Sequence, residues 1–207
     1  MTAFSLLIRG GQTVDPTGRR RADIGIVDGV IEAVETTLDP VDAAVVLDAS
    51  DAVVATGFVD LCARVGEPGN ESAETVESAA IGAAVGGFTT IHSSPDTQPV
   101  LDDPSVVRDL QRLAAAAPIT VKAIGAITKG CAGTDLAPMR EMAALGVSLF
   151  SNGGRYITDG GLMRRAFEYL RNAEATMMVH PEAADVCGSG IMHEGECSSR
   201  MGVAGRP

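Results

Sequence analysis

The spacing of apolar residues changes once along the chain, after Asp48. Before that point, short apolar stretches alternate with turn signals such as Asp28-Gly29, a pattern typical of strands joined by tight turns. We therefore predict a small antiparallel β module over residues 1–52. Its strands are expected at Leu6–Arg9, Asp23–Val27, Val30–Val34 and Val45–Leu47.

From residue 53 to residue 207, apolar runs alternate with stretches in which apolar residues recur at helical spacing. This alternation predicts βα units and a parallel sheet, which both doubly wound folds and (β/α)8 barrels contain. The strands are expected at Val53–Leu61, Phe88–Ser93, Ile119–Ile127, Val147–Ser151 and Thr176–His180. The helices are expected at Glu71–Val85, Pro104–Ala116, Ala137–Leu145 and Gly161–Asn172, with a last one beginning near His193.

Periodicity alone does not separate these two folds. A closed barrel needs eight strands and five are predicted here, so a barrel would be incomplete or completed by something else. The two edge strands of such a sheet would be unpaired, and proteins normally cover such edges. We therefore expect an oligomer, or another element, to cover them.

The charge balance narrows the classes of partner. The 207 residues include 16 basic and 27 acidic side chains, a net charge of −11, which repels nucleic acid and anionic membranes. No apolar run is long enough for a membrane helix, and the first ten residues do not resemble a signal peptide. The four cysteines form no Cys-X-X-Cys pair. We expect a cytoplasmic protein with reduced thiols.

Polar residues follow the predicted strands at their carboxyl ends, where parallel α/β sheets carry their chemistry. Cys62 and Arg64 follow the first strand, Asp96 the second, Asn152 the fourth and His180 the fifth. We expect Cys62 to be a small buried residue rather than a ligand or nucleophile, and His92 to be an ordinary hydrogen-bonded histidine.

Five segments, in this order along the chain, resemble landmarks of the dihydroorotases, which belong to the amidohydrolase superfamily. They are Gly57-Phe58-Val59-Asp60-Leu61, Glu67-Pro68-Gly69, Gly86-Gly87-Phe88-Thr89-Thr90, Pro95-Asp96-Thr97-Gln98-Pro99 and His193-Glu194-Gly195-Glu196. The resemblance implies an α/β fold: an amidohydrolase-type (β/α)8 TIM barrel, with about five strands present, preceded by a small β-sandwich module.

The resemblance also implies a reaction, the interconversion of carbamoyl aspartate and dihydroorotate on one or two zinc ions. The zinc polarises the carbonyl and lowers the pKa of a bound water. Its ligands in the family include a His-X-His at the end of the first strand, an anionic residue after the fourth strand and a histidine after the fifth. Only His180 matches this pattern.

The other metal positions are substituted. Cys62 and Arg64 replace the His-X-His, and Asn152 stands where the family has consecutive aspartates. A guanidinium stays protonated and repels a divalent cation, so we expect zinc to be absent or weakly bound. For Arg64 the choice is between a structural ion pair and a new substrate anchor. We expect the ion pair, formed with Glu67 or Asp96, which would fill the vacated space.

The substrate-binding positions depart from the family as well. Gly66 replaces an arginine that pairs with the substrate carboxylate, and Asp96 replaces the asparagine of a Pro-Asn-Thr segment. These changes remove charge-assisted hydrogen bonds and add a negative charge, so dihydroorotate should bind poorly.

Three functions stay open. The favoured one is a non-catalytic dihydroorotase-like protein with a structural or regulatory role beside aspartate transcarbamoylase, with which inactive chains of this family assemble. The second is an active cyclic amidohydrolase with a rearranged or externally completed site. The third is a truncated, non-functional fragment.

Overall fold

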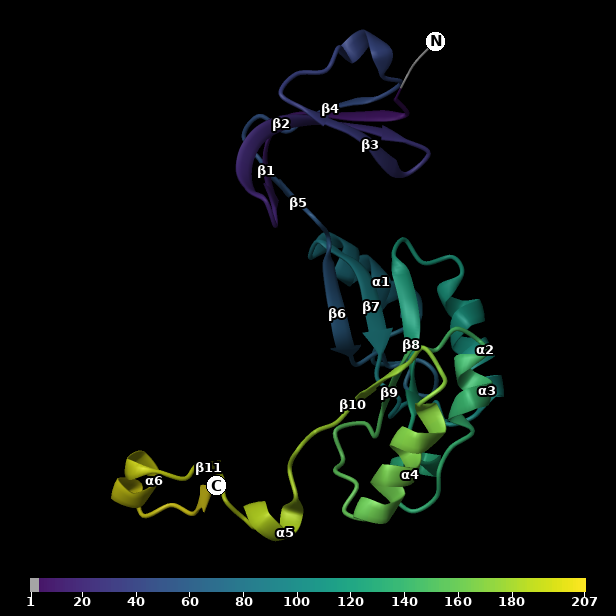
Figure 1. The fold of residues 1–207 in the computed structure, drawn as a ribbon, viewed down its shortest axis with the longest axis vertical. Helices are drawn as coiled ribbons and strands as arrows, with labels where there is room; N and C mark the ends of the chain where they lie inside the picture. The colour runs from purple at the N-terminus through teal and green to yellow at the C-terminus, as the bar shows by residue number, and fades with distance from the viewer. Residues whose placement is uncertain (1–3) are drawn as a thin grey trace. The chain divides into compact units, whose positions relative to one another are not determined.

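The computed structural model describes residues 4–207 and shows two compact units, which divide after Gly57. Figure 1 shows an N-terminal unit of strands with one short helical turn, η1 (Pro40–Asp42), and a second unit of alternating strands and helices. Among the described residues, no helix combines the length and the apolar character that crossing a membrane requires.

The N-terminal unit is a single mixed sheet. Its strands are β1 (Leu6–Asp15), β2 (Gly18–Val27), β3 (Val30–Glu35), β4 (Val46–Asp48) and β5 (Val53–Ala55). The order is β3-β2-β1-β4, and β5 also pairs with β1. Asp28 and Gly29 both have positive φ, as a two-residue hairpin between β2 and β3 requires.

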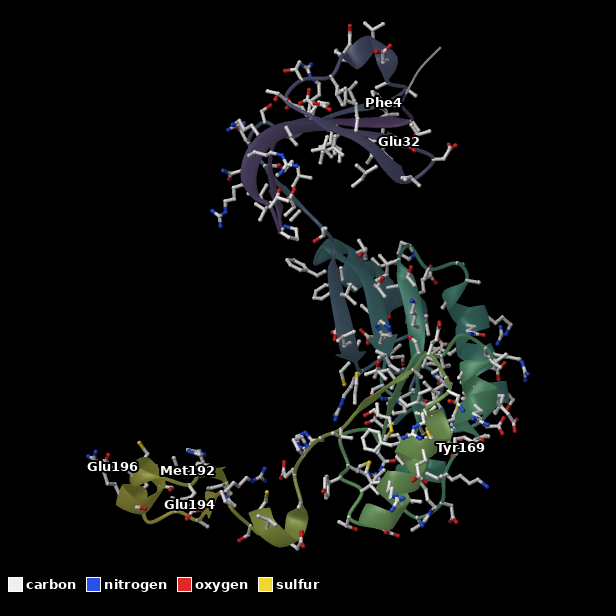
Figure 2. All side chains as sticks on the ribbon, viewed as in Figure 1. Phe4, Glu32, Tyr169, Met192, Glu194 and Glu196 are labelled. Atoms are coloured by element: carbon white, nitrogen blue, oxygen red, sulfur yellow. The ribbon has the colours of Figure 1, made fainter. Side chains whose placement is uncertain are left out.

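The prediction of a wholly antiparallel module over residues 1–52 is wrong for β4, which runs parallel to β1. Strand β5, which lies beyond the predicted module, is also parallel to β1. The predicted strand Val53–Leu61 is also two strands, since β5 pairs with β1 in the first unit and β6 begins at Phe58 in the second. Phe4, labelled in Figure 2, has its ring directly over Gly25, where a Cβ would collide with it.

The second unit contains the predicted parallel sheet, in the order β10-β9-β8-β7-β6. Its strands are β6 (Phe58–Ala63), β7 (Phe88–Ser93), β8 (Thr120–Ala126), β9 (Leu149–Ser151) and β10 (Thr176–Met178). All four neighbouring pairs are parallel. The carboxyl ends of the strands therefore lie at the same end of the sheet, and the loops that follow them can form a common site.

Helices connect and cover these strands. They are α1 (Val76–Val85), α2 (Pro104–Ala114), α3 (Met139–Ala143) and α4 (Gly160–Leu170), followed by the short α5 (Ala184–Cys187) and α6 (Glu196–Met201). Helix α1 begins later than predicted because Thr75 caps it, accepting a hydrogen bond from the amide of Ser78. Strand residues such as Ile91 and Phe150 pack with Val107 and Leu162 of the helices in one buried core.

The last part of the chain differs from the expectation of a helix near His193. Met192 and His193 form β11, which pairs with β12 (Gly205–Arg206), and α6 begins only at Glu196. Figure 2 labels Met192, Glu194 and Glu196 in this segment. The Gly195 amide donates to the Ser198 hydroxyl at 2.9 Å, which satisfies one of the free amides at the helix start.

Candidate functional site

The loops after β6 and β7 form a pocket of about 500 Å³. It is lined by three of the six predicted site residues, Arg64, Gly66 and Asp96, together with neighbours such as Ser94 and Gln98. The Ser94 amide donates to the Ala63 carbonyl at 2.8 Å and so joins the two loops at their base. Cys62, Asn152 and His180 are not among the residues that line this pocket.

Arg64 does not form the predicted ion pair. Within residues 4–207, no carboxylate lies within 4.0 Å of its guanidinium, so the expectation of a bond to Glu67 or Asp96 is wrong. Glu67 instead accepts a hydrogen bond from the amide of Val76, at 2.9 Å, in the first turn of α1. A carboxylate at a helix N-terminus interacts favourably with the helix dipole, which explains why the Glu67 side chain binds there.

Gly66 is enclosed by backbone. A Cβ at this position would lie 2.6 Å from the carbonyl oxygen of Glu74 and 2.7 Å from that of Asn70. The Asn70 amide also donates to the Gly66 carbonyl at 2.8 Å, so the loop is fastened at this point. The arginine that the family carries here could be accommodated only if residues 70–74 moved.

The residues at the end of β6 are open to solvent. Cys62 is exposed, so the expectation of a small buried residue is wrong. Its amide donates to the Asp60 carboxylate at 2.8 Å.

His92 is buried with Nδ1 3.2 Å from the Asp60 carbonyl, which confirms the prediction of an ordinary hydrogen-bonded histidine.

Asn152 is buried and has both ends of its amide engaged. Its Oδ1 accepts from the Thr128 hydroxyl at 2.6 Å, and its Nδ2 donates to the Cys131 carbonyl at 3.2 Å. The same Thr128 oxygen accepts from the Gly133 amide at 2.9 Å. The side chain of Asn152 thus holds together the loops after β8 and β9.

Two members of this cluster, Thr128 and Cys131, were missed by the sequence reasoning, because no motif marks the loop after β8. Burial raises the pKa of the Cys131 thiol to about 11; the negative charge of Asp96 adds to the shift and the positive charge of Arg155 opposes it. Gly153, with φ of 63°, lies against Asp96: a Cβ there would be 3.1 Å from the Asp96 Cβ. Asp96 therefore lies between the pocket and the buried cluster.

His180 has a different neighbourhood. Its Nε2 lies 2.8 Å from one oxygen of Glu182, and Arg206 Nη1 lies 2.7 Å from the other. The pKa of the Glu182 carboxyl is lowered, mainly by the hydrogen bond from His180 and to a smaller extent by the positive charge of Arg206. The signal that could have revealed this pair was the carboxylate two residues after His180.

The donors present do not fit the family zinc. No three His, Cys, Asp or Glu side chains in residues 4–207 are grouped closely enough to hold a metal ion. Arg64 is a cation, the amide of Asn152 is occupied on both sides, and His180 Nε2 is bound to Glu182. A catalytic zinc needs about three protein ligands, which the described residues do not bring together.

Comparison with known proteins places this arrangement in a family. A family model described as "Dihydro-orotase-like" matches residues 51–207. The dihydroorotase of Anaeromyxobacter dehalogenans (strain 2CP-C) is 42% identical over 206 residues, covering 98% of this chain and 47% of the relative. That of Solibacter usitatus is 40% identical over 205 residues, with the same coverage. The chain spans about half the length of these relatives.

Solved structures show the fold. The L-hydantoinase of Arthrobacter aurescens superposes with a TM-score of 0.71 at 19% identity, covering 89% of this chain and 42% of that one. A D-hydantoinase from Thermus sp. gives 0.67 at 23% identity, covering 88% and 41%. The five parallel strands are thus part of an incomplete amidohydrolase-type (β/α)8 TIM barrel, as predicted. The chain belongs to the dihydroorotase-like family.

Proposed function

We propose that this chain is a non-catalytic dihydroorotase-like protein with a structural or regulatory role in pyrimidine biosynthesis. The observation that carries the proposal is Arg64, which occupies a metal-ligand position of the family with a fixed positive charge and no neutralising carboxylate among the described residues. A guanidinium has no lone pair to donate and repels zinc.

The state of Asn152 supports the same conclusion. In the family an anionic residue at this place binds the metal, whereas here the amide bonds to Thr128 and Cys131 inside the protein. Turning it toward a metal would leave the buried Thr128 hydroxyl without an acceptor and would remove the hydrogen bond to the Cys131 carbonyl, which is costly. The position has a structural task instead.

The proposed partner is aspartate transcarbamoylase, as the resemblance to inactive family members implies. The second unit offers apolar surface for an association: Phe58, Val59 and Leu61 on β6 are more than half exposed, and Val85 on α1 is 86% exposed. In the sheet formed by residues 58–178, β6 is an edge strand, and exposed apolar residues on an edge strand favour contact with another chain. We propose that a partner or a second copy covers this edge.

Dihydroorotate turnover by the purified chain with added zinc tests the proposal. We expect no zinc-dependent turnover and no stoichiometric zinc. The restored variant C62H/R64H/N152D should gain zinc affinity, whereas the control C197H/R108H, which changes two exposed residues elsewhere, should not. Circular dichroism establishes that each variant is folded. Gly66 is left unchanged because its surroundings exclude a side chain.

Zinc-dependent turnover by the unmodified chain would contradict the proposal and favour an active cyclic amidohydrolase with unconventional ligands. The partner is tested separately, by light scattering of the chain mixed with aspartate transcarbamoylase from the same organism. A single species of summed mass supports the association, and two independent species contradict it.

A further inference from the structure

A positive and a negative side chain line the same pocket without meeting. Arg64 and Asp96 both border the 500 Å³ pocket, yet within residues 4–207 neither has an oppositely charged group within 4.0 Å. Neither side chain has a hydrogen bond to another described residue. Their bonding capacity is therefore directed to solvent or to a ligand.

Other polar groups around the pocket are also unused. Among the described residues, the hydroxyl of Ser94 and the side-chain amide of Gln98 have no hydrogen-bond partner, although both residues line the pocket. Ser94 is only 5% exposed, and its hydroxyl is not sealed off from solvent. A concave site of this size with a few convergent polar groups is typical of small-molecule binding.

The charges around the pocket select the kind of ligand. Arg64 is outnumbered by Glu74 and Asp96, and the chain as a whole carries a net charge of −11. A ligand with two carboxylates, such as carbamoyl aspartate, would meet one cation and two anions. A molecule with one carboxylate and one ammonium group can pair with both signs of charge at once.

We propose that this pocket binds a small zwitterion of the α-amino-acid type, with its carboxylate on Arg64 and its ammonium group facing Asp96. No ion pair between Arg64 and Asp96 competes with the ligand for these two charges. The Gln98 amide is available for a polar ligand side chain.

The position of Asp96 supports its part in this site. Gly153, which does not line the pocket, packs against Asp96 from the loop after β9 and restricts its side chain. The binding needs neither zinc nor turnover, so it goes beyond the proposed function.

The test is a ¹H–¹⁵N NMR titration of the purified chain with L-glutamine. We expect saturable shifts of the Val65, Ser94 and Thr97 amides. Nα-acetyl-L-glutamine, which lacks the ammonium group, and L-glutamine α-amide, which lacks the carboxylate, should each bind about tenfold more weakly or worse, because each loses one charge-assisted contact.

The variants R64Q and D96N should weaken L-glutamine binding by a similar factor. The matched controls R108Q and D135N change exposed residues outside the pocket and should bind as the unmodified chain does. The spectra themselves report whether each variant is folded. Turnover of dihydroorotate would contradict the proposed function without affecting this result.

Two outcomes would overturn the inference. One is the absence of any saturable shift with L-glutamine up to about 50 mM, well beyond the millimolar range of weak specific binding. The other is equal affinity of the R64Q or D96N variant, or of either truncated ligand, which would show that the two charges do not recognise the ligand.

Discussion

The hydroxyl of Thr128 donates a 2.6 Å hydrogen bond to Oδ1 of Asn152, and both side chains are buried. This bond joins the loop after β8 to the loop after β9, at the end of the sheet where an amidohydrolase-type barrel carries its chemistry. A position that serves metal binding in the family thus serves loop packing here.

Replacing Asn152 by alanine should lower the free energy of unfolding by about 1–3 kcal/mol, because the Thr128 hydroxyl and the Cys131 carbonyl lose their partner in the interior. Urea denaturation measures the change. The control N172A removes an exposed asparagine and should stay within about 0.5 kcal/mol of the unmodified chain. Equal stability of the two variants would contradict a structural role for Asn152.

Gly66 and Gly82 should respond in opposite ways to alanine. G66A brings a Cβ to 2.6 Å from the Glu74 carbonyl oxygen and should destabilise the protein by about 1–3 kcal/mol. At Gly82, within α1, a Cβ would meet no atom within 4 Å, so G82A should stabilise by about 0.5–1 kcal/mol. Urea melts of both variants measure the two changes. A G66A variant as stable as the unmodified chain, or more stable, would contradict the crowding around Gly66.

Cys131 should resist alkylation in the folded protein. Its pKa of about 11 keeps the thiol protonated at pH 8, and only the thiolate reacts. Iodoacetamide followed by peptide mass spectrometry should therefore detect modification of the exposed Cys62 and Cys197 at least about tenfold faster. In urea the difference should disappear, since unfolding removes the burial. Fast modification of Cys131 in the native state would contradict the assignment.

The same shift has a consequence for stability at alkaline pH. The folded pKa of Cys131 is raised above its ordinary value of 9.0, so the folded state holds this proton more tightly than the unfolded state. The stabilising contribution is present below pH 9 and is lost as the pH rises toward about 11. In C131A the part of the pH dependence that comes from this thiol should vanish, as urea melts between pH 8 and pH 11 can measure.

Glu182 should titrate below the ordinary range of a glutamate. The hydrogen bond from His180 is the largest cause, so H180A should raise the pKa of Glu182 more than R206A does. Since the pKa of Glu182 is lowered in the folded state, its interaction with His180 and Arg206 stabilises the folded protein at pH values above the ordinary pKa of a glutamate. This stabilisation is lost as the pH falls through the folded pKa. Carboxyl ¹³C NMR follows the titration. R200A is the control, because Arg200 contacts Glu196 instead.

The parallel sheet could be predicted from the sequence because short, largely apolar segments alternate with stretches in which apolar residues recur at helical spacing. The predicted bounds of β7, Phe88–Ser93, are those of the structure. The run Val53–Leu61 could not be divided correctly, because β5 and β6 are both apolar and only the pairing of β5 with β1 separates them. The periodicity of a short segment does not show which distant segment it pairs with.

The residues of the candidate site could be predicted because they follow the carboxyl ends of parallel strands, and Arg64, Gly66 and Asp96 do line one pocket. The partners of the side chains were not predictable. Glu67 points to the first turn of α1 rather than to Arg64, because an unpaired helix amide competes for the carboxylate. The bond between Thr128 and Asn152 joins residues 24 positions apart and has no sequence signature.

The enclosure of Gly66 by the carbonyl oxygens of Asn70 and Glu74 also bears on how this chain can evolve. A single substitution cannot place an arginine at position 66, because its Cβ would collide with the backbone of Asn70 and Glu74. Rotating the side chain does not relieve this collision, since the Cβ stays in place. The loop of residues 70–74 would have to open beforehand. Departure from the family pattern at this position is therefore difficult to reverse one residue at a time.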